Sequence, residues 1–186
     1  MSNINPASFL GGNKGAWKVT RMETITGASL APVPYVDMQP SHFPQSSLES
    51  VAWVLRGSNV HVRYTDRKEV AELTARQESL NRPEATCAAL IPIRKSAQWW
   101  QMPQDERRTV FEEESRHISM SMAYLPAIAR RLYQCRELGE PFDFLTWFEF
   151  APAHANLFNE LVVKLWATRE WQFVEREVDI RLLHQG

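Results

Sequence analysis

The chain has 186 residues and a formal net charge of −1, with 44% hydrophobic and 23% charged residues. These ordinary values exclude an intrinsically disordered chain, and the balanced charge excludes a nucleic-acid binder that depends on bulk electrostatics, because phosphate binding requires a basic excess. No apolar run reaches the ~18 residues of a membrane span, and the N-terminus lacks the pattern of a secretory signal. We therefore expect a cytoplasmic protein with no nucleic acid or membrane partner.

The N-terminal half is predicted to hold two strands and one helix. Residues 1–16 are rich in Gly, Asn and Ser and are expected to be flexible. The elements that follow in chain order are a strand at Trp17–Thr26, a proline-punctuated loop at Ala31–Ser47, a strand at Val51–Leu55 and a helix at Asp66–Leu80.

The C-terminal half has clearer patterns. A helix is expected to open at Pro103 and Asp105, where acidic residues favour a helix N-terminus, and to run towards His117. The other predicted elements are strands at Thr86–Ile93, Ala127–Arg136, Phe142–Phe150 and Gln172–Leu182 and an amphipathic helix at Ala153–Thr168. The second and third of these strands flank a Gly-Glu-Pro turn and are predicted to form a hairpin.

This order of elements predicts the fold class. From Thr86 onward it reads strand, helix, strand, strand, helix, strand, which is typical of the ferredoxin-like split βαβ fold. The first half is interpreted as a shortened copy of the same unit. The sequence thus predicts an α+β protein with an N-terminal half at 17–85 and a C-terminal half at 86–186, forming one structural unit.

Composition leaves two points open. Two cysteines, Cys87 and Cys135, are too few for a disulfide framework, so two free thiols are expected, with a single bridge as the alternative. Seven tryptophans and nine phenylalanines indicate a large apolar pocket or an extensive interface, although an aromatic core explains the same composition.

The five histidines do not predict a metal site built from protein ligands alone, because no pair has i, i+4 spacing and no Cys pair has zinc spacing. His117, near the end of the acidic helix, is followed by an apolar stretch. A lone histidine usually caps a helix or faces solvent, but one histidine is enough to hold a haem iron axially.

Two charged residues are candidates for a site with His117. Strand alternation places Arg130 on the same face as Ile128 and Leu132, where a guanidinium needs an acidic partner or an anionic ligand. Glu170, just after the last helix, is one candidate among several for the carboxylate that a ligating imidazole normally contacts.

Four segments in fixed order resemble the chlorite dismutase family. The resemblance extends from Trp17 to Leu182, is strongest from Asn81 onward, and is closest to the short, dimeric branch of that family. The matching segments are Ala89–Trp100 (ALIPIRKSAQWW), Asp105–Arg108 (DERR), His117 with Arg130 thirteen residues later, and Phe142–Glu149 (FDFLTWFE).

The resemblance implies a homodimer of dimeric α+β barrel subunits, each with one haem b, that converts chlorite to chloride and dioxygen and binds small anions at its distal site. It makes His117 the axial iron ligand, Arg130 the catalytic residue, and Glu170 and Lys95 the residues behind the histidine. The cofactor-binding positions that it implies are Ile91, Trp99, Trp100, Leu132, Thr146 and Phe148.

Related activities remain as alternatives. Coproporphyrin-haem decarboxylases carry an uncharged residue in place of Arg130 and a tyrosine at the position of Ile91, and dye-decolourising peroxidases place an aspartate where this chain has Ala129. These differences weigh against both of those activities. The hypotheses that still compete with a dismutase are a haem peroxidase and a non-catalytic haem-binding or haem-transfer protein of the same fold. Chlorite needs no proton removed, unlike hydrogen peroxide, so a pocket without a general base favours the dismutase.

Overall fold

A computed structural model describes residues 5–40, 50–59 and 66–186 of the chain, and it places eight strands in one closed antiparallel barrel. The strands are β1 (Asn5–Gly12), β2 (Trp17–Thr26), β3 (Tyr35–Pro40), β4 (Val51–Asn59), β5 (Cys87–Lys95), β6 (Ile128–Gln134), β7 (Phe144–Phe150) and β8 (Val174–His184).

The barrel divides into two sets of four strands that follow the chain. Its order is β1-β3-β2-β8-β5-β7-β6-β4, so the N-terminal set meets the C-terminal set where β2 pairs with β8 and where β4 meets β6. The second contact is a single pair, Ser58 with Gln134. Gly57 permits this close approach, because a Cβ atom there would lie 2.7 Å from Cβ of Tyr133.

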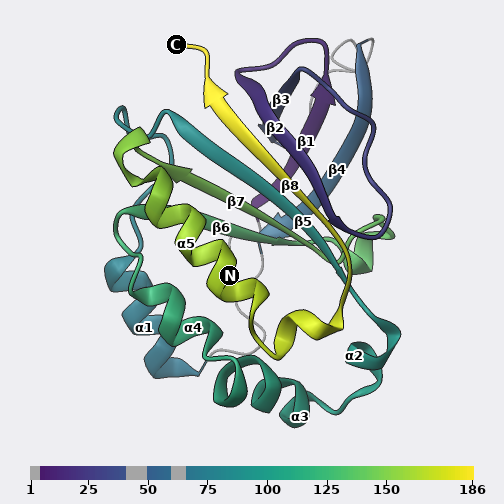
Figure 1. Cartoon of the computed structure of the whole chain (residues 1–186), viewed down its shortest axis with the longest axis vertical. Coiled ribbons are helices and arrows are strands. Elements are labelled where there is room, and N and C mark those ends of the chain that lie inside the picture. Colours follow the sequence, from purple (N-terminus) through teal and green to yellow (C-terminus); the bar gives the residue numbers. More distant parts are fainter. Residues whose placement is uncertain (1–4, 41–49, 60–65) are drawn as a thin grey trace.

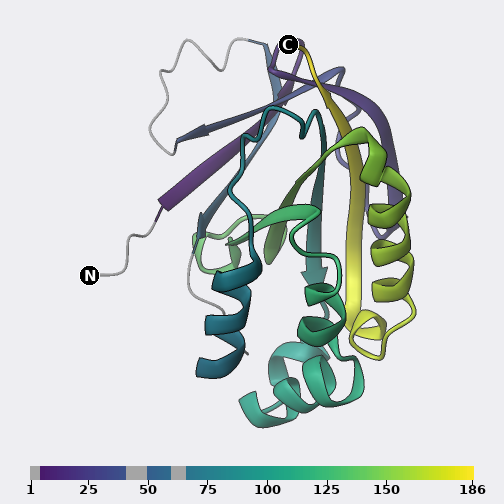
Figure 2. The ribbon, with the colours of Figure 1, turned by 90° about the vertical axis from the view of Figure 1, so that its left-hand side faces the viewer.

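The helices cover the outer face of β5–β8 and extend beyond one end of the sheet (Figure 1). Figure 2 shows that α5 runs along β8 and that α1 and α4 lie near each other beside it. Their bounds are α1 (Arg67–Arg76), α2 (Ala97–Gln101), α3 (Gln104–Arg108), a π-helical turn (Thr109–Glu114), α4 (His117–Met122) and α5 (Ala155–Trp166), with short 3₁₀ turns at Arg136–Leu138, Pro152–His154 and Glu170–Phe173.

The strands β5 and β7 are almost entirely buried on both faces, and β6 is buried at both ends. Alternate residues such as Leu90, Tyr133 and Trp147 point into the barrel and form its core. Their neighbours, among them Ile91, Phe144 and Phe148, point outward and form a second core with α5. The outward face of this sheet is the one on which a site can form between strands and helices.

Several predicted elements are confirmed. The strand at Trp17–Thr26 has the predicted bounds, and the β6–β7 hairpin joins the predicted strands through antiparallel pairing. Cys87 and Cys135 are free thiols, as expected. The C-terminal half has the predicted order of strands and helices, with the strand order β8-β5-β7-β6 in the sheet.

The structure contains two strands that the sequence analysis does not predict. Asn5–Gly12, inside the expected flexible segment 1–16, forms β1 and pairs with β3 and β4, so the prediction of flexibility is wrong for these residues. Tyr35–Pro40, inside the expected loop Ala31–Ser47, forms β3, and residues 41–47 of that loop lie outside the described residues. Both strands form by pairing with segments that are distant in the sequence, and such pairing cannot be predicted from the local sequence.

Helical boundaries also differ from the predictions. The helix expected at Asp66–Leu80 ends at Arg76, and the single helix expected from Asp105 to His117 is a chain of three short pieces. His117 therefore begins α4 and does not end the acidic helix. None of the helices in the described parts of the chain combines the length and the apolar character that a membrane-spanning helix needs.

Candidate functional site

A cavity lies between the outward face of the sheet and the helices. The space it encloses is about 1150 Å³ when the open mouth is counted. One wall comes from β5, β6 and β7, and the other comes from α4, α5 and the segment around Glu170. Most of the lining is aliphatic or aromatic, so a ligand here is largely removed from water.

His117 enters this cavity from α4 and is held by a buried carboxylate. Its Nδ1 lies 2.6 Å from Oε2 of Glu170, and the other oxygen of Glu170 accepts a hydrogen bond from Lys95 Nζ at 2.7 Å. The main-chain N–H of Glu170 donates to the Ser115 hydroxyl at 2.9 Å. With Nδ1 engaged in this way, Nε2 is the ring atom left for a metal ligand bond.

The charges around Glu170 keep its carboxylate ionised. Burial by itself raises the pKa of a carboxyl group, and Glu170 is only 3% exposed. The Lys95 ammonium and the His117 ring more than offset that effect, and the pKa of Glu170 is lowered to about 2. Glu170 therefore offers His117 a permanent hydrogen-bond acceptor at neutral pH.

The local backbone places His117 at the start of a helix. The π-helical turn Thr109–Glu114 ends before Arg116, whose φ of 52° and ψ of 36° are left-handed. The Glu112 carboxylate then accepts the main-chain N–H groups of Ile118 at 2.6 Å and Ser119 at 3.1 Å. Glu112 thereby satisfies two donors that the first turn of α4 leaves unpaired.

Replacing Glu112 by alanine is expected to lower the free energy of unfolding by about 1 kcal/mol, because two N–H groups at the start of α4 lose their acceptor. Urea denaturation followed by circular dichroism measures this change. The control is Glu113→Ala, since Glu113 is exposed and such a substitution is expected to change the stability by less than about 0.5 kcal/mol. Equal effects of the two substitutions would contradict the capping role.

Arg130 enters the same cavity from the opposite wall. It lies on β6 with Ile128 and Leu132 on its face, as predicted, and all three line the cavity. Among the described residues no carboxylate forms an ion pair with it, so the alternative of an acidic partner within the fold finds no support there. Burial lowers the pKa of Arg130, but a guanidinium starts from an ordinary pKa above ~12 and stays charged at neutral pH.

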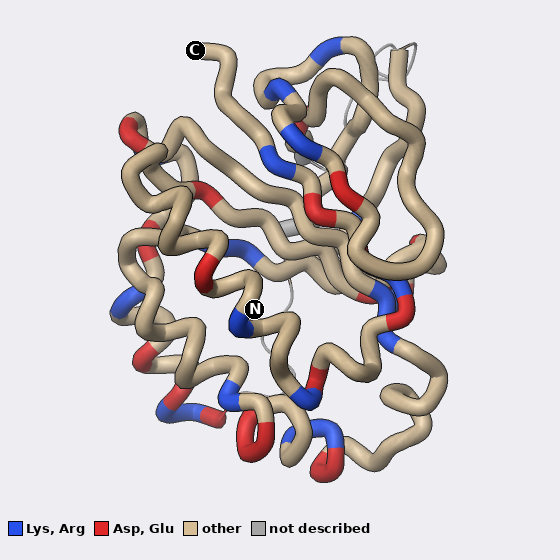
Figure 3. The backbone as a smooth tube through the Cα atoms, viewed as in Figure 1, with Lys and Arg blue, Asp and Glu red and all other residues tan. Residues whose placement is uncertain are grey.

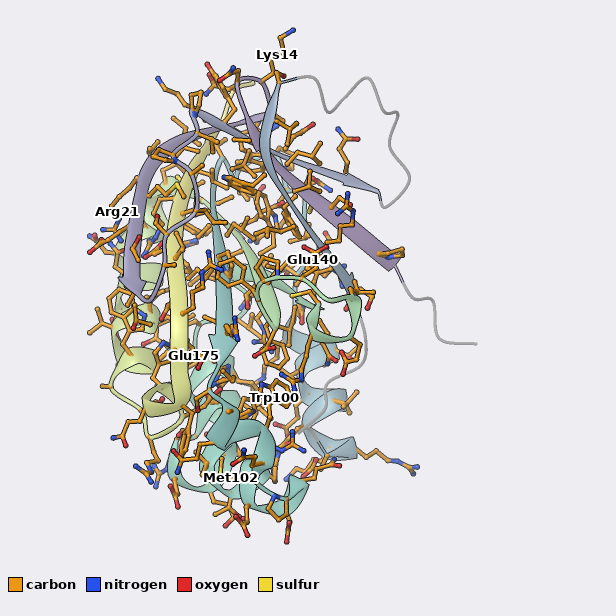
Figure 4. The ribbon with its side chains drawn as sticks, turned by 90° about the vertical axis from the view of Figure 1, so that its right-hand side faces the viewer. Lys14, Arg21, Trp100, Met102, Glu140 and Glu175 are labelled. Carbon is orange, nitrogen blue, oxygen red and sulfur yellow. The ribbon has the colours of Figure 1, made fainter. Side chains whose placement is uncertain are left out.

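The other predicted site residues divide between the cavity and its surroundings. Trp100 lies outside the lining: its indole N–H donates to Asp143 at 3.0 Å, and its ring lies 4.2 Å from the Arg136 guanidinium. Figure 4 places Trp100 with Met102 at the helical end of the molecule. The predicted residues that do line the cavity with His117, Arg130, Glu170 and Lys95 are Ile91, Trp99, Leu132, Thr146 and Phe148.

Sequence reasoning missed Glu177, which is fully buried and lines the cavity. Its carboxylate accepts the indole N–H groups of Trp166 and Trp171. Alternation along β8 places Glu177 on the same face of the strand as Asp179 and Arg181, and three charged residues on one face predict exposure to solvent. The burial of Glu177 arises from α5 and the turn after it, so no pattern within the strand reports it.

An ion pair joins the helices beside the cavity. Arg108 of α3 donates to both oxygens of Glu69 of α1, at 2.7 and 2.9 Å, and Glu69 also completes the capping box of α1 with Asp66. The hydrogen bonds from Arg108 hold the pKa of Glu69 below its ordinary value. Elsewhere on the helical end, acidic and basic residues are interspersed along the backbone, in keeping with the balanced net charge (Figure 3).

Removal of this ion pair by Glu69→Gln is expected to cost about 1 kcal/mol of unfolding free energy at pH 7. Because the folded-state pKa is lowered, the contribution is present above the unfolded pKa of about 4.3 and is lost as pH falls through the folded value. Urea denaturation at pH 7 and pH 3 measures it, with Glu72→Gln on the same helix as the control. A difference between wild type and variant that stayed constant down to pH 3 would contradict the assignment.

Comparison with known proteins gives one consistent family. The family model for chlorite dismutase matches residues 38–183. A curated chlorite dismutase from Ideonella dechloratans is 32% identical over 78 residues, which cover 42% of this chain and only 25% of that protein.

Solved structures of the same family share the fold. A dimeric chlorite dismutase from Nitrobacter winogradskyi is 54% identical, with a TM-score of 0.89 and coverage of 96% of this chain and 99% of that chain. A chlorite dismutase from Candidatus Nitrospira defluvii in complex with imidazole is 19% identical, with a TM-score of 0.67 and coverage of 95% and 90%. The second likeness shows the fold alone.

Proposed function

The chain belongs to the chlorite dismutase family, and from this membership we propose that it is a haem b-dependent enzyme that converts chlorite to chloride and dioxygen. The reaction ClO₂⁻ → Cl⁻ + O₂ conserves atoms and charge and needs no external oxidant. The observation that carries the proposal is a single cavity in which His117, held by Glu170, shares the lining with the charged Arg130.

The residues of the cavity fit a haem. His117 would hold the iron through Nε2, and the apolar side chains on both walls would enclose the porphyrin, with Trp99, Leu132 and Phe148 among them. When bound, the haem would supply the iron redox chemistry that activates chlorite. The hydrogen bond from His117 to Glu170 makes the imidazole a stronger electron donor and fixes its orientation.

Arg130 would bind and retain the anionic substrate. A guanidinium in a largely apolar cavity attracts an anion more strongly than it would in water, because the local dielectric constant is low. Its planar array of donors also suits an oxyanion with two oxygens. Arg130 therefore has the charge and the donors to hold chlorite and its fragments in the cavity until dioxygen has formed.

The neighbours of Arg130 favour chlorite over hydrogen peroxide as the substrate. Leu132 and Phe148 line the cavity beside Arg130, with Thr146 paired to Leu132 across the strands. None of these side chains is a carboxylate or an imidazole. Chlorite needs no general base, whereas peroxide must lose a proton. We therefore expect little ordinary peroxidase activity.

The finer points of architecture and assembly belong to the same proposal. The orders β4-β1-β3-β2 and β8-β5-β7-β6 match position for position, which supports two ferredoxin-like halves at 17–85 and 86–186, with β1 added to the first. The likeness to the dimeric Nitrobacter winogradskyi protein supports a homodimer. A cytoplasmic location stays a prediction.

Oxygen evolution tests the proposed function directly. Haem-loaded protein is mixed with chlorite in an oxygen electrode while the ferric absorption spectrum is recorded, with free haem at equal concentration as the control. We expect prompt release of one mole of dioxygen per mole of chlorite and much slower turnover of hydrogen peroxide. A bound haem without oxygen release would instead favour a peroxidase or a haem carrier, and failure to take up haem would refute the proposal.

A further inference from the structure

Behind His117 lies a second buried carboxylate, which belongs to Glu177 of β8. Its side chain is fully removed from solvent, and each of its oxygens accepts one indole N–H group. Trp166 Nε1 donates to Oε1 at 2.9 Å, and Trp171 Nε1 donates to Oε2 at 2.7 Å. No Lys or Arg of the described residues forms an ion pair with it, so two neutral donors are its hydrogen-bond partners there.

One of these two indoles packs against the candidate iron ligand. The ring of Trp171 is stacked on that of His117, with centroids 6.1 Å apart and planes 20° apart. Phe111 is also stacked on His117, at 4.5 Å and 22°. Lys95 Nζ, which pairs with Glu170, lies 5.3 Å from the Trp171 centroid. Trp171 therefore connects Glu177 to the group formed by His117, Glu170 and Lys95.

We infer that Glu177 is a positioning residue for His117 and that it acts through Trp171. This inference rests on the proposed function, in which His117 is the iron ligand. Glu170 restrains rotation of the imidazole at Nδ1, while Glu177 anchors the indole that packs on the face of the same ring. Together the two carboxylates fix both the direction and the plane of the ligand.

The energetics of burial fit a positioning role. A buried carboxylate without an ion-pair partner is costly, and it is tolerated only when hydrogen bonds satisfy it. Burial raises the pKa of Glu177, and the two indole hydrogen bonds act in the opposite direction. An amide in its place would present an NH₂ group to one of the two donors and leave that indole without an acceptor.

The test compares Glu177→Gln with Glu149→Gln in the haem-loaded protein. Glu149 is a matched control because it is also buried and accepts an indole N–H, from Trp147 at 2.8 Å, but it does not line the cavity. The readouts are the iron–imidazole stretching band in resonance Raman spectra of the ferrous form, the reduction potential of the iron and the rate of haem transfer to a haem acceptor protein.

For Glu177→Gln we expect a shifted or broadened iron–imidazole band, a raised reduction potential and haem loss about tenfold faster than in wild type. The potential rises because a negative charge near the iron favours the ferric state. Glu149→Gln is expected to lower the stability of the fold and leave the band and the potential at wild-type values. Trp171→Phe, which keeps an aromatic ring but removes the donor, is expected to move the band as Glu177→Gln does.

The outcomes separate this inference from the proposed function. Wild-type values of the band and the potential in both Glu177→Gln and Trp171→Phe would overturn the inference alone, as would equal shifts in Glu149→Gln. A wild-type protein that binds no haem, or whose haem is not held by His117, would overturn the assignment on which the inference rests.

Discussion

Replacement of Arg130 by alanine is expected to lower kcat/KM for chlorite by about 10²–10³-fold and to leave haem binding intact, because the variant loses its charged donor to the substrate but keeps His117. The side chain lines the cavity and has no acidic partner among the described residues, so its charge is available to a ligand. Its removal leaves Ile128, Leu132 and Phe148 around the position, and none of these stabilises an anion.

Two further variants make this result specific. Arg130→Lys keeps the charge but loses the planar pair of donors, so we expect an intermediate loss of activity. Arg131→Ala removes the adjacent arginine, which points to the other face of β6 and does not line the cavity, and we expect near-normal turnover. Oxygen release measured against chlorite concentration gives the values. Unchanged kinetics in Arg130→Ala would remove Arg130 from the proposed mechanism.

The sequence predicts the C-terminal sheet well because its strands carry strong local patterns. Phe144–Phe150 is rich in aromatic and apolar residues and is buried on both faces, so composition alone indicates a strand. The strands β1 and β3 contain Gly11, Gly12 and Pro40, residues that local rules assign to loops or flexible segments. They form because the barrel pairs β1 with both β3 and β4, a condition that is only met once the chain has folded.

The site shows the same division between local and non-local information. Strand alternation correctly predicts that Arg130 faces the apolar side of β6, since that geometry is a property of the strand itself. The start of α4 at His117 depends on the left-handed Arg116 and on Glu112, and neither Gly nor Pro marks that break in the sequence. Local sequence does not distinguish Glu170 from other acidic candidates, because its contact with His117 spans 53 residues, and only the family resemblance singles it out.

Replacement of His117 by alanine is expected to weaken haem binding by at least about 100-fold, since the loss of a ligand exceeds the 10–100-fold effects typical of its supporting residues. Among the described residues, His117 is the one imidazole that lines the cavity. The control is His184→Ala, whose ring packs on Trp17 at 4.8 Å outside the cavity. Haem titration followed by absorption measures both variants, and a normal spectrum in His117→Ala would reassign the ligand.

Added imidazole extends this prediction to the residues behind the ligand. In His117→Ala the space of the lost ring is still faced by the Glu170 carboxylate. Lys95 continues to donate to that carboxylate, and the Ser115 hydroxyl continues to accept the main-chain N–H of Glu170. Free imidazole is therefore expected to restore haem binding by donating one N–H to Glu170 and offering its other nitrogen to the iron. In the double variant with Glu170→Gln the acceptor is no longer charged, and restoration is expected to need a higher imidazole concentration. Equal imidazole dependence in the two variants would show that Glu170 does not orient the ligand.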